Sequence, residues 1–240
     1  MKIPKIIHYC WFGKGEMSSL EKRCIASWKK YCPDFQIKLW NEVNFDVNYC
    51  EFTKEAYKLG KYAFVSDVAR LYALQQVGGI YLDTDMLLLK PIPLHFLKQK
   101  LFIGAENKKS LNAAALGAEK GNGLINKSLC FYSSQEFDSR PPLITHVLSE
   151  IIIDIQFPIT KNQKNEWGLV LNPDVFYPLP FKNKVLSFNK FVTEETVGVH
   201  LWNASWKSDG SKNKFFKWIK YQLSKIYLPN SPQWYKEKFR

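Results

Sequence analysis

The sequence predicts an α/β fold with a mostly parallel central sheet flanked by helices, and three observations support this prediction. Short apolar, β-rich segments alternate along the chain with stretches whose apolar residues recur at helical spacing. The 240 residues, 46% of them hydrophobic, suit one globular domain with a sizeable core. The polar pair Asp83 and Asp85 follows a short apolar segment that we expect to be a strand. In such folds, ligands bind beyond the carboxyl ends of strands.

The expected elements alternate from the N-terminus onward. Residues 5–12 predict a buried first strand. Ser18 and Glu21 have the spacing of a capping box, and Pro33 ends the helix that they begin. Strands are expected at 35–40, 80–83, 86–90 and 101–105, further extended pieces at 169–171, 185–188 and 197–202, and helices at 50–59, 61–77, 123–132 and 143–154.

Positive charge is concentrated at the C-terminus. Residues 207–240 contain nine Lys and Arg against two acidic residues, so they carry +7 of the net +12. Within this tail, residues 212–226 place apolar side chains mostly on one face and lysines largely around the other, which is typical of a helix on an anionic membrane surface. A helix packed on the domain with a solvated basic face fits equally well. We therefore expect one domain over 1–206 and a basic amphipathic tail over 207–240.

The cysteine pattern and the lack of a long apolar segment indicate the cellular compartment. The five cysteines include no C-x-x-C pair, which favours a reducing compartment over a disulfide framework or a zinc site. No run of about 18 apolar residues occurs, and the first residues make a poor signal peptide. We expect a cytoplasmic protein, peripheral on the inner face of the cell membrane if the tail binds lipid.

Asp83 and Asp85 are the strongest candidates for metal ligands. Two carboxylates at i and i+2 of an extended segment point the same way and repel each other unless a cation lies between them. A hard divalent ion bound by one or two carboxylates also binds substrate phosphates. A lone D-x-D is more often a solvated turn, but here the apolar segments 80–82 and 86–89 flank the pair. The motif therefore indicates a clamp for a metal and a diphosphate.

Asp67 and Arg70 lie three positions apart on the helix expected over 61–77, so they share a face. An exposed ion pair of little energetic value is the simpler interpretation. The functional interpretation has Asp67 accept hydrogen bonds from sugar hydroxyls, while the guanidinium of Arg70 reaches the sugar or the diphosphate.

Several motifs together resemble one family of sugar transferases. Residues 66–85 follow the pattern S-D-x-x-R-x-x-x-L-x-x-x-G-G-x-Y-x-D-x-D, and the segments 3–13, 27–42 and 200–206 also fit the family in order. The chain thus resembles the DXD-containing transferases of glycosyltransferase family 32, which are related to fungal-type initiating mannosyltransferases and to large bacterial glucosylating toxins. The resemblance implies a GT-A-type nucleotide-sugar-binding fold and a retaining transfer.

The resemblance also implies roles for individual residues. Asp67, Arg70, Asp83 and Asp85 would form the catalytic group, and Asp83, Asp85 and His200 would bind Mn²⁺ or Mg²⁺. A lone histidine near an apolar strand is more often a core residue, but the motif H-x-W-x-x-S-W favours a ligand. The nucleotide-sugar would contact Trp11, Ser66, Asp67, Arg70, Tyr81, Asp83, Asn112, Ser205 and Trp206.

The expected substrate is a hexose or N-acetylhexosamine donor linked to a nucleoside diphosphate, with UDP favoured and GDP allowed. The acceptor would be a glycan or lipid-linked glycan in the synthesis of a bacterial capsule, lipopolysaccharide or other surface polysaccharide. Two other classes are weighed against this. A basic nucleic-acid- or membrane-binding module lacks any named nucleic-acid motif, so no nucleic-acid partner is expected. A D-x-D phosphoryl transferase usually has a hydroxyl residue where this chain has Leu87.

Overall fold

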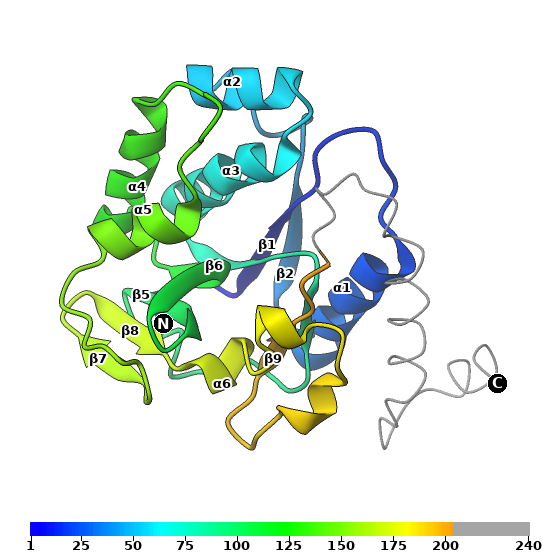
Figure 1. The fold of residues 1–240 in the computed structure, drawn as a ribbon, viewed down its shortest axis with the longest axis vertical. Helices are drawn as coiled ribbons and strands as arrows, with labels where there is room; N and C mark the ends of the chain where they lie inside the picture. Colours follow the sequence, from blue (N-terminus) through cyan, green and yellow to red (C-terminus); the bar gives the residue numbers. More distant parts are fainter. Residues whose placement is uncertain (204–240) are drawn as a thin grey trace.

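The computed structural model describes residues 1–203, which fold into a central sheet with helices on both faces (Figure 1). Five of the seven strands of this central sheet run in one direction, all except β6 and β7, which confirms the predicted α/β fold with a mostly parallel sheet. In spatial order the strands are β2 (Gln36–Trp40), β1 (Ile6–Cys10), β3 (Gly79–Leu82), β6 (Ser110–Ala118), β5 (Leu101–Asn107), β8 (Gly168–Leu171) and β7 (Gln163–Asn165).

Two layers cover this sheet. Helix α3 contacts β1, β3 and β6 on one face and carries α2 and α4 on its outer side, while α5 packs on β6. The other face holds α1, α6 and the small antiparallel pair of β4 and β9. The bounds are α1 (Ser19–Tyr31), α2 (Glu51–Lys58), α3 (Tyr62–Val77), α4 (Gly123–Ser133), α5 (Ile144–Ile151), α6 (Pro173–Phe176), the 3₁₀ helices η1 (Phe181–Asn183) and η2 (Phe188–Lys190), β4 (Met86–Leu88) and β9 (Gly198–His200).

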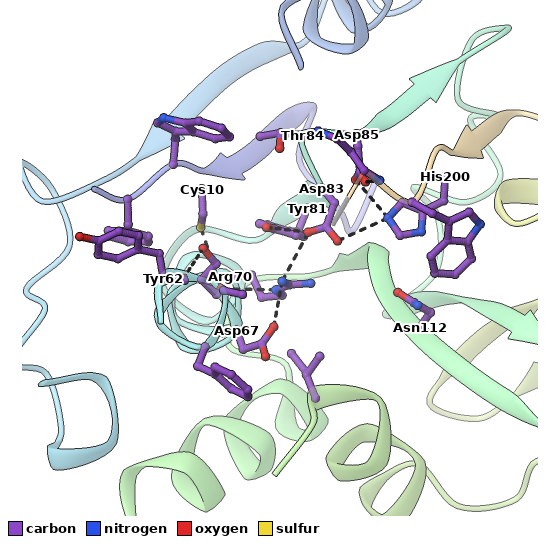
Figure 2. A pocket seen from close by; sticks show the side chains of 18 of the residues that line it. Cys10, Tyr62, Asp67, Arg70, Tyr81, Asp83, Thr84, Asp85, Asn112 and His200 are labelled. Atoms are coloured by element: carbon purple, nitrogen blue, oxygen red, sulfur yellow. Dashed lines mark hydrogen bonds and ion pairs between the residues drawn. The ribbon is translucent and has the colours of Figure 1, made fainter. Parts of the chain in front are cut away.

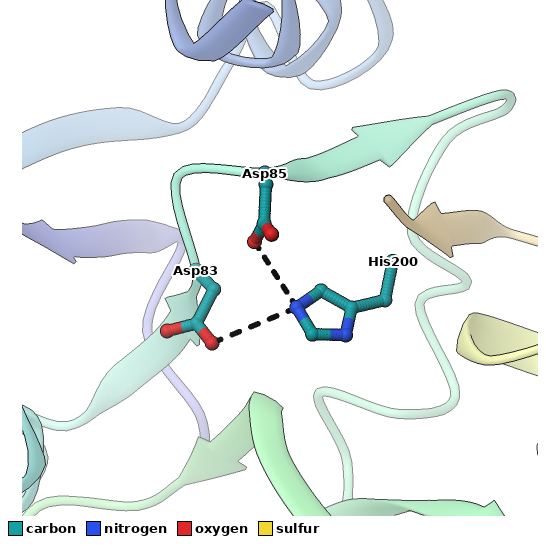
Figure 3. A group of neighbouring side chains, drawn as sticks. All are labelled: Asp83, Asp85 and His200. Carbon is teal, nitrogen blue, oxygen red and sulfur yellow. Dashed lines mark ion pairs between the residues drawn. The ribbon is translucent and has the colours of Figure 1, made fainter. Parts of the chain in front are cut away.

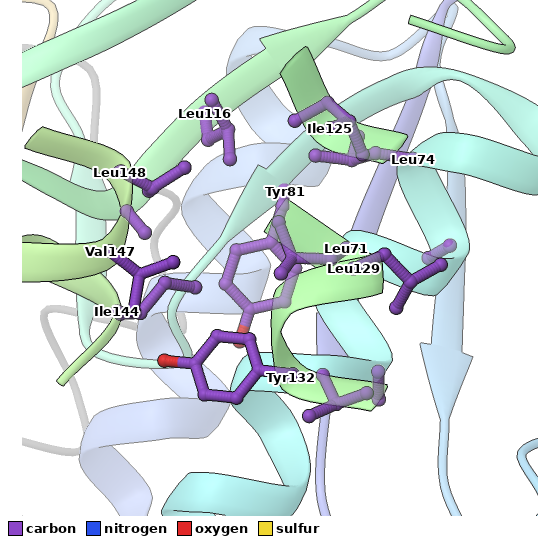
Figure 4. Packing of buried hydrophobic residues seen from close by; sticks show 14 of the residues in the cluster. Leu71, Leu74, Tyr81, Leu116, Ile125, Leu129, Tyr132, Ile144, Val147 and Leu148 are labelled. Atoms are coloured by element: carbon purple, nitrogen blue, oxygen red, sulfur yellow. The ribbon is translucent and has the colours of Figure 1, made fainter. Parts of the chain in front are cut away.

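Alternation along the strands divides the core into two clusters. In β3, Ile80 and Leu82 face the α1 side, whereas Tyr81 faces α3, as expected for side chains with a period of two. Figure 4 shows Tyr81 packed among side chains from α3, α4 and α5. Both faces of β3 are therefore buried, and this packing fixes the position of the D-x-D segment that follows the strand.

Some elements differ from the sequence-based predictions. The helix expected over 143–154 ends at Ile151, and the extended piece expected at 185–188 is instead the connection from η1 to the first residue of η2. Strand β6 was not predicted, because its run of alanines has low strand propensity. Small residues are required there, since a Cβ atom on Gly117 would lie 2.1 Å from the ring of Phe102. Tertiary packing thus outweighs local propensity in β6.

The pair Gly78–Gly79 connects α3 to β3 at a point of close approach. Both glycines have positive φ, at 71° and 118°. His8 packs against this pair of glycines. It is fully buried, and its Nε2 atom hydrogen-bonds the Gly78 carbonyl at 2.7 Å. A Cβ atom on Gly79 would lie 2.8 Å from that Nε2 atom and 2.7 Å from the Ile6 carbonyl oxygen. Gly78 and Gly79 are therefore required by the positive φ angles and the close packing at this connection.

Candidate active site

A tight turn directly after β3 holds Asp83 and Asp85. The Asp83 amide donates to the Ala114 carbonyl of β6 at 3.0 Å, and the Met86 amide donates back to the Asp83 carbonyl at 2.9 Å. The turn is therefore closed by its own backbone and anchored to the neighbouring strand. Both carboxylates are fixed at the carboxyl end of a buried strand, as the sequence pattern predicts.

Pairing of β4 with β9 brings His200 to these carboxylates. Met86 lies opposite His200 in the two-stranded ladder. The Nε2 atom of His200 is 3.0 Å from Oδ1 of Asp85 and 3.8 Å from Oδ2 of Asp83 (Figure 3). One ligand atom from each of the three residues lies within 4.8 Å of the other two. The structure thus gathers the three residues that the resemblance implies as metal ligands.

Each of the two carboxylates divides its oxygen atoms between the protein and the shared space beside His200. For Asp83, Oδ1 accepts a hydrogen bond from the Tyr81 hydroxyl at 2.9 Å, which leaves Oδ2 directed at the imidazole. For Asp85, Oδ2 accepts from the Asn203 amide at 2.8 Å, which leaves Oδ1 directed there. Two carboxylate oxygens and one imidazole nitrogen form a donor set that fits Mn²⁺ or Mg²⁺.

Asp85 and His200 shift each other's pKa. Burial opposes the charge on both Asp85 and His200, but their mutual attraction, together with the backbone hydrogen bonds to Asp85 and the charge of Asp83 near His200, outweighs it. As a result the pKa of Asp85 lies below its usual value and the pKa of His200 lies above its own. A metal ion would bind His200 through its neutral imidazole, so metal binding and protonation of this ring would compete.

Arg70 connects helix α3 to the turn that carries Asp83. Its Nη2 atom lies 2.8 Å from Oδ1 of Asp67 and 3.4 Å from Oδ1 of Asp83, and its Nη1 atom donates to the Ala113 carbonyl at 3.1 Å. The guanidinium also stacks 4.4 Å from the centroid of the Tyr81 ring (Figure 2). Burial opposes its charge, yet Asp83 leads the groups that raise the pKa of Arg70, so it stays cationic.

The carboxyl group of Asp67 has a raised pKa. Burial raises its pKa to about 7, although Arg70 acts in the opposite direction. Its side chain retains 12% exposure and lines the pocket. The pair Asp67–Arg70 is therefore buried beside the D-x-D segment, which excludes the simpler interpretation of an exposed surface ion pair.

A pocket of about 600 Å³ connects these groups. Trp11 lines it from the loop after β1, where its indole nitrogen donates to the Gly15 carbonyl at 2.7 Å. Ser66 and Tyr81 line it too, and so does Asn112 of β6, near His200 in Figure 2. The side-chain oxygen of Asn112 accepts from the Ala114 amide at 2.8 Å. Ser205 and Trp206, expected over the diphosphate, lie outside the described residues.

Several pocket residues carried no functional signal in the sequence. Glu21 was expected only as a capping residue, yet it is 1% exposed, lines the pocket and accepts a hydrogen bond from the Asn203 side chain. Glu106 lines the pocket and accepts from the Asn112 amide nitrogen at 2.8 Å. Tyr177, a core residue that does not line the pocket, donates to the Asn112 backbone carbonyl at 3.2 Å. Only tertiary structure places these residues at the site, because no local motif includes them.

The comparison with known families decides which class of protein this site belongs to. Residues 18–108 match the family described as glycosyltransferase sugar-binding region containing DXD motif, and the matched segment includes Asp67, Arg70, Asp83 and Asp85. This region is similar to the sugar-binding region of DXD-containing glycosyltransferases. The resemblance drawn from the sequence motifs is thereby confirmed, and the Asp83–Asp85 pair is the D-x-D of this glycosyltransferase region.

Curated relatives of this DXD glycosyltransferase region are animal enzymes. Lactosylceramide 4-alpha-galactosyltransferase of Mus musculus is 30% identical over 161 residues, which cover 61% of this chain and 42% of that protein. The enzyme of the same name from Rattus norvegicus is 29% identical over 162 residues, with the same shares. The chain therefore spans less than half the length of these two relatives.

A solved structure extends the likeness beyond the DXD region. A glycosyltransferase involved in the glycosylation of the major capsid of PBCV-1 superposes with a TM-score of 0.52 at 11% identity, covering 90% of this chain and 100% of that one. This likeness concerns the fold, and it confirms the GT-A-type fold implied by the resemblance. Within residues 1–203, no helix is both long and apolar enough to cross a bilayer.

Proposed function

We propose that this chain is a metal-dependent, retaining glycosyltransferase that moves a hexose or N-acetylhexosamine from a UDP-sugar to a glycan acceptor. The observation that carries the proposal is the trio of Asp83, Asp85 and His200, in which one carboxylate oxygen of each aspartate lies within 4.8 Å of an imidazole nitrogen. This trio lines a pocket of about 600 Å³, the size of a typical small-ligand site. Mn²⁺ fits the donor set, and Mg²⁺ is the alternative ion.

The bound ion would supply charge neutralisation for the departing diphosphate. The chain's own residues perform the remaining tasks. Arg70, held by two carboxylates and a backbone carbonyl, presents a fixed positive charge toward the pocket. Asp67 is positioned to accept hydrogen bonds from the donor sugar through its second carboxylate oxygen. Trp11 is partly exposed at the other side of the pocket, where its indole can stack on the uracil base.

Retention is proposed to occur by front-face attack, with the leaving phosphate taking the proton of the acceptor hydroxyl. The pocket carboxylates support this route. Both oxygens of Glu21 accept hydrogen bonds, from Ser18 and from Asn203. Glu106 is engaged through Oε2 by Asn112. Glu21 is thus held through both oxygens and Glu106 through one, and a covalent glycosyl-enzyme adduct trapped on either residue would contradict the proposal.

The acceptor is proposed to be a glycan or a lipid-linked glycan of a surface polysaccharide or glycolipid. Support comes from the curated relatives, whose name specifies lactosylceramide as their acceptor. A cytoplasmic location, with attachment to the inner face of the membrane through the basic residues 207–240, is part of this proposal. It rests on the charge of that segment, nine Lys and Arg against two acids.

The proposed activity is tested by nucleotide release from UDP-glucose, UDP-galactose, UDP-N-acetylglucosamine, UDP-N-acetylgalactosamine and GDP-mannose, with Mn²⁺ and water as the acceptor. We expect release from one UDP-sugar, a released sugar that first appears as the α anomer by NMR, and loss of release in Asp85→Asn. Glu51→Ala, which changes an exposed carboxylate on α2, is the matched control. Release of the β anomer would contradict retention, and equal release by Asp85→Asn would contradict the proposed site.

A further inference from the structure

Glu21 occupies a place that its position at the start of a helix does not explain. It stands in the first turn of α1, and Ser18 caps this helix by accepting a hydrogen bond from the Leu20 amide. A first-turn carboxylate ordinarily stays in solvent, where it interacts with the helix dipole. Glu21 is instead 1% exposed, and its side chain turns inward to the pocket. Such burial of a carboxylate is costly unless its oxygens are hydrogen-bonded.

Its hydrogen bonds lead to the metal site. One carboxylate oxygen accepts from the Ser18 hydroxyl and the other from the side-chain amide of Asn203. The backbone amide of Asn203 in turn donates to Oδ2 of Asp85 at 2.8 Å. The chain from Glu21 to Asp85 therefore passes through a single residue, and that residue lies directly after the segment that carries His200.

Two further observations concern the backbone that leads to Asn203. Trp202, the preceding residue, has a positive φ of 56°, a conformation that is strained for a bulky side chain. The Leu201 amide donates to the backbone carbonyl of Asp85 at 3.1 Å, so residues 201–203 follow the D-x-D segment closely. The bond from Glu21 fixes the far end of this strained connection.

We propose that Glu21 is a positioning residue for the metal site: through Asn203 it holds the oxygen atom of Asp85 that does not face the metal. With Oδ2 fixed in this way, Oδ1 is kept directed at the point shared with His200 and Asp83. Outer groups that orient metal ligands typically change metal affinity by about ten- to a hundredfold when they are removed. The inference rests on the metal site of the proposed function.

The experiment measures Mn²⁺ affinity directly, by electron paramagnetic resonance of free Mn²⁺ titrated with the full chain. We expect Glu21→Ala to weaken binding about tenfold or more. Glu21→Gln should restore affinity to near the unmodified value, because its amide oxygen still accepts from Asn203 and its amide nitrogen can donate to Ser18. Glu51→Ala, which removes an exposed first-turn carboxylate from α2, should leave affinity unchanged.

A double-mutant cycle with Asn203→Ala distinguishes positioning from general damage to the fold. If Glu21 acts through Asn203, each single substitution and the pair weaken Mn²⁺ binding to the same degree. Near-ultraviolet circular dichroism and the thermal midpoint establish that each variant is folded. Multiplicative effects of the two substitutions, or unchanged Mn²⁺ affinity in folded Glu21→Ala, would overturn the inference. Absence of Mn²⁺ binding by the unmodified protein would overturn the proposed metal site and the inference together.

Discussion

His200 and Asp85 lie 3.0 Å apart, Nε2 to Oδ1, although they come from distant parts of the sequence. The short ladder between β4 and β9 creates this contact, because Met86 and His200 are directly opposite each other in it. One aspartate of the D-x-D belongs to the end of the main sheet and the other adjoins the small sheet. The proposed metal site therefore forms only where the main sheet and the β4–β9 pair are both in place.

Arg70 is expected to be the single most important side chain for the stability of the site. The residue is 6% exposed, and its guanidinium is shared by Asp67 and Asp83. Arg70→Met leaves the buried carboxylate of Asp67 and the partly buried one of Asp83 without their cation, so the free energy of unfolding should fall by about 3–5 kcal/mol in urea titrations. Lys54→Met, which breaks the exposed pair with Glu51, should change it by less than about 1 kcal/mol. Similar values for the two variants would contradict the account.

Gly79 is expected to tolerate no side chain. Gly79→Ala places a Cβ atom against the Ile6 carbonyl and the His8 ring at a φ of 118°, and should lower the free energy of unfolding by at least about 2 kcal/mol. Gly121 also has positive φ, at 73°, but nothing lies within 4 Å of the added atom. Gly121→Ala should therefore cost only about 1 kcal/mol of backbone strain. Equal losses in thermal unfolding would show that strain, and not contact, explains Gly79.

His8 is expected to make the protein sensitive to mild acid. It is buried between the Trp40 indole, which donates to Nδ1 at 3.0 Å, and the Gly78 carbonyl. Burial, with a smaller contribution from Lys38, lowers the pKa of His8 to about 4, despite the opposing bond to Gly78. Between pH 6.5 and about 4 the unfolded chain binds this proton and the folded chain does not, so stability falls as the pH falls through that range.

The size of this effect follows from the shift in pKa. We expect His8 to account for about 3 kcal/mol of lost stability by pH 4. His8→Gln, whose amide can keep one of the two hydrogen bonds, should show a shallower dependence of unfolding free energy on pH over the same range. Parallel curves for the two proteins, measured by urea titration at several pH values, would show that other groups cause the acid sensitivity.

Local sequence predicts much of this molecule, and its limits are physical. Strands with apolar or β-branched residues, such as β1 and β3, and the long helix α3 are visible from periodicity. The D-x-D pair and the Asp67–Arg70 pair are visible because each lies within one element. Glu21 and Glu106 are not, because their contacts to Asn203 and Asn112 form only when distant or neighbouring elements pack together. The alanine-rich β6 is missed for the same reason.

The most direct test of the account is calorimetric titration of UDP into the full chain with and without Mn²⁺, for the unmodified protein and for Asp85→Asn. The account predicts that Mn²⁺ strengthens UDP binding at least about tenfold, equivalent to about 1.4 kcal/mol, and that Asp85→Asn removes this gain. UDP binding that is equal with and without Mn²⁺, or a gain that survives in folded Asp85→Asn, would contradict the claim that Asp83, Asp85 and His200 hold a catalytic metal against the diphosphate.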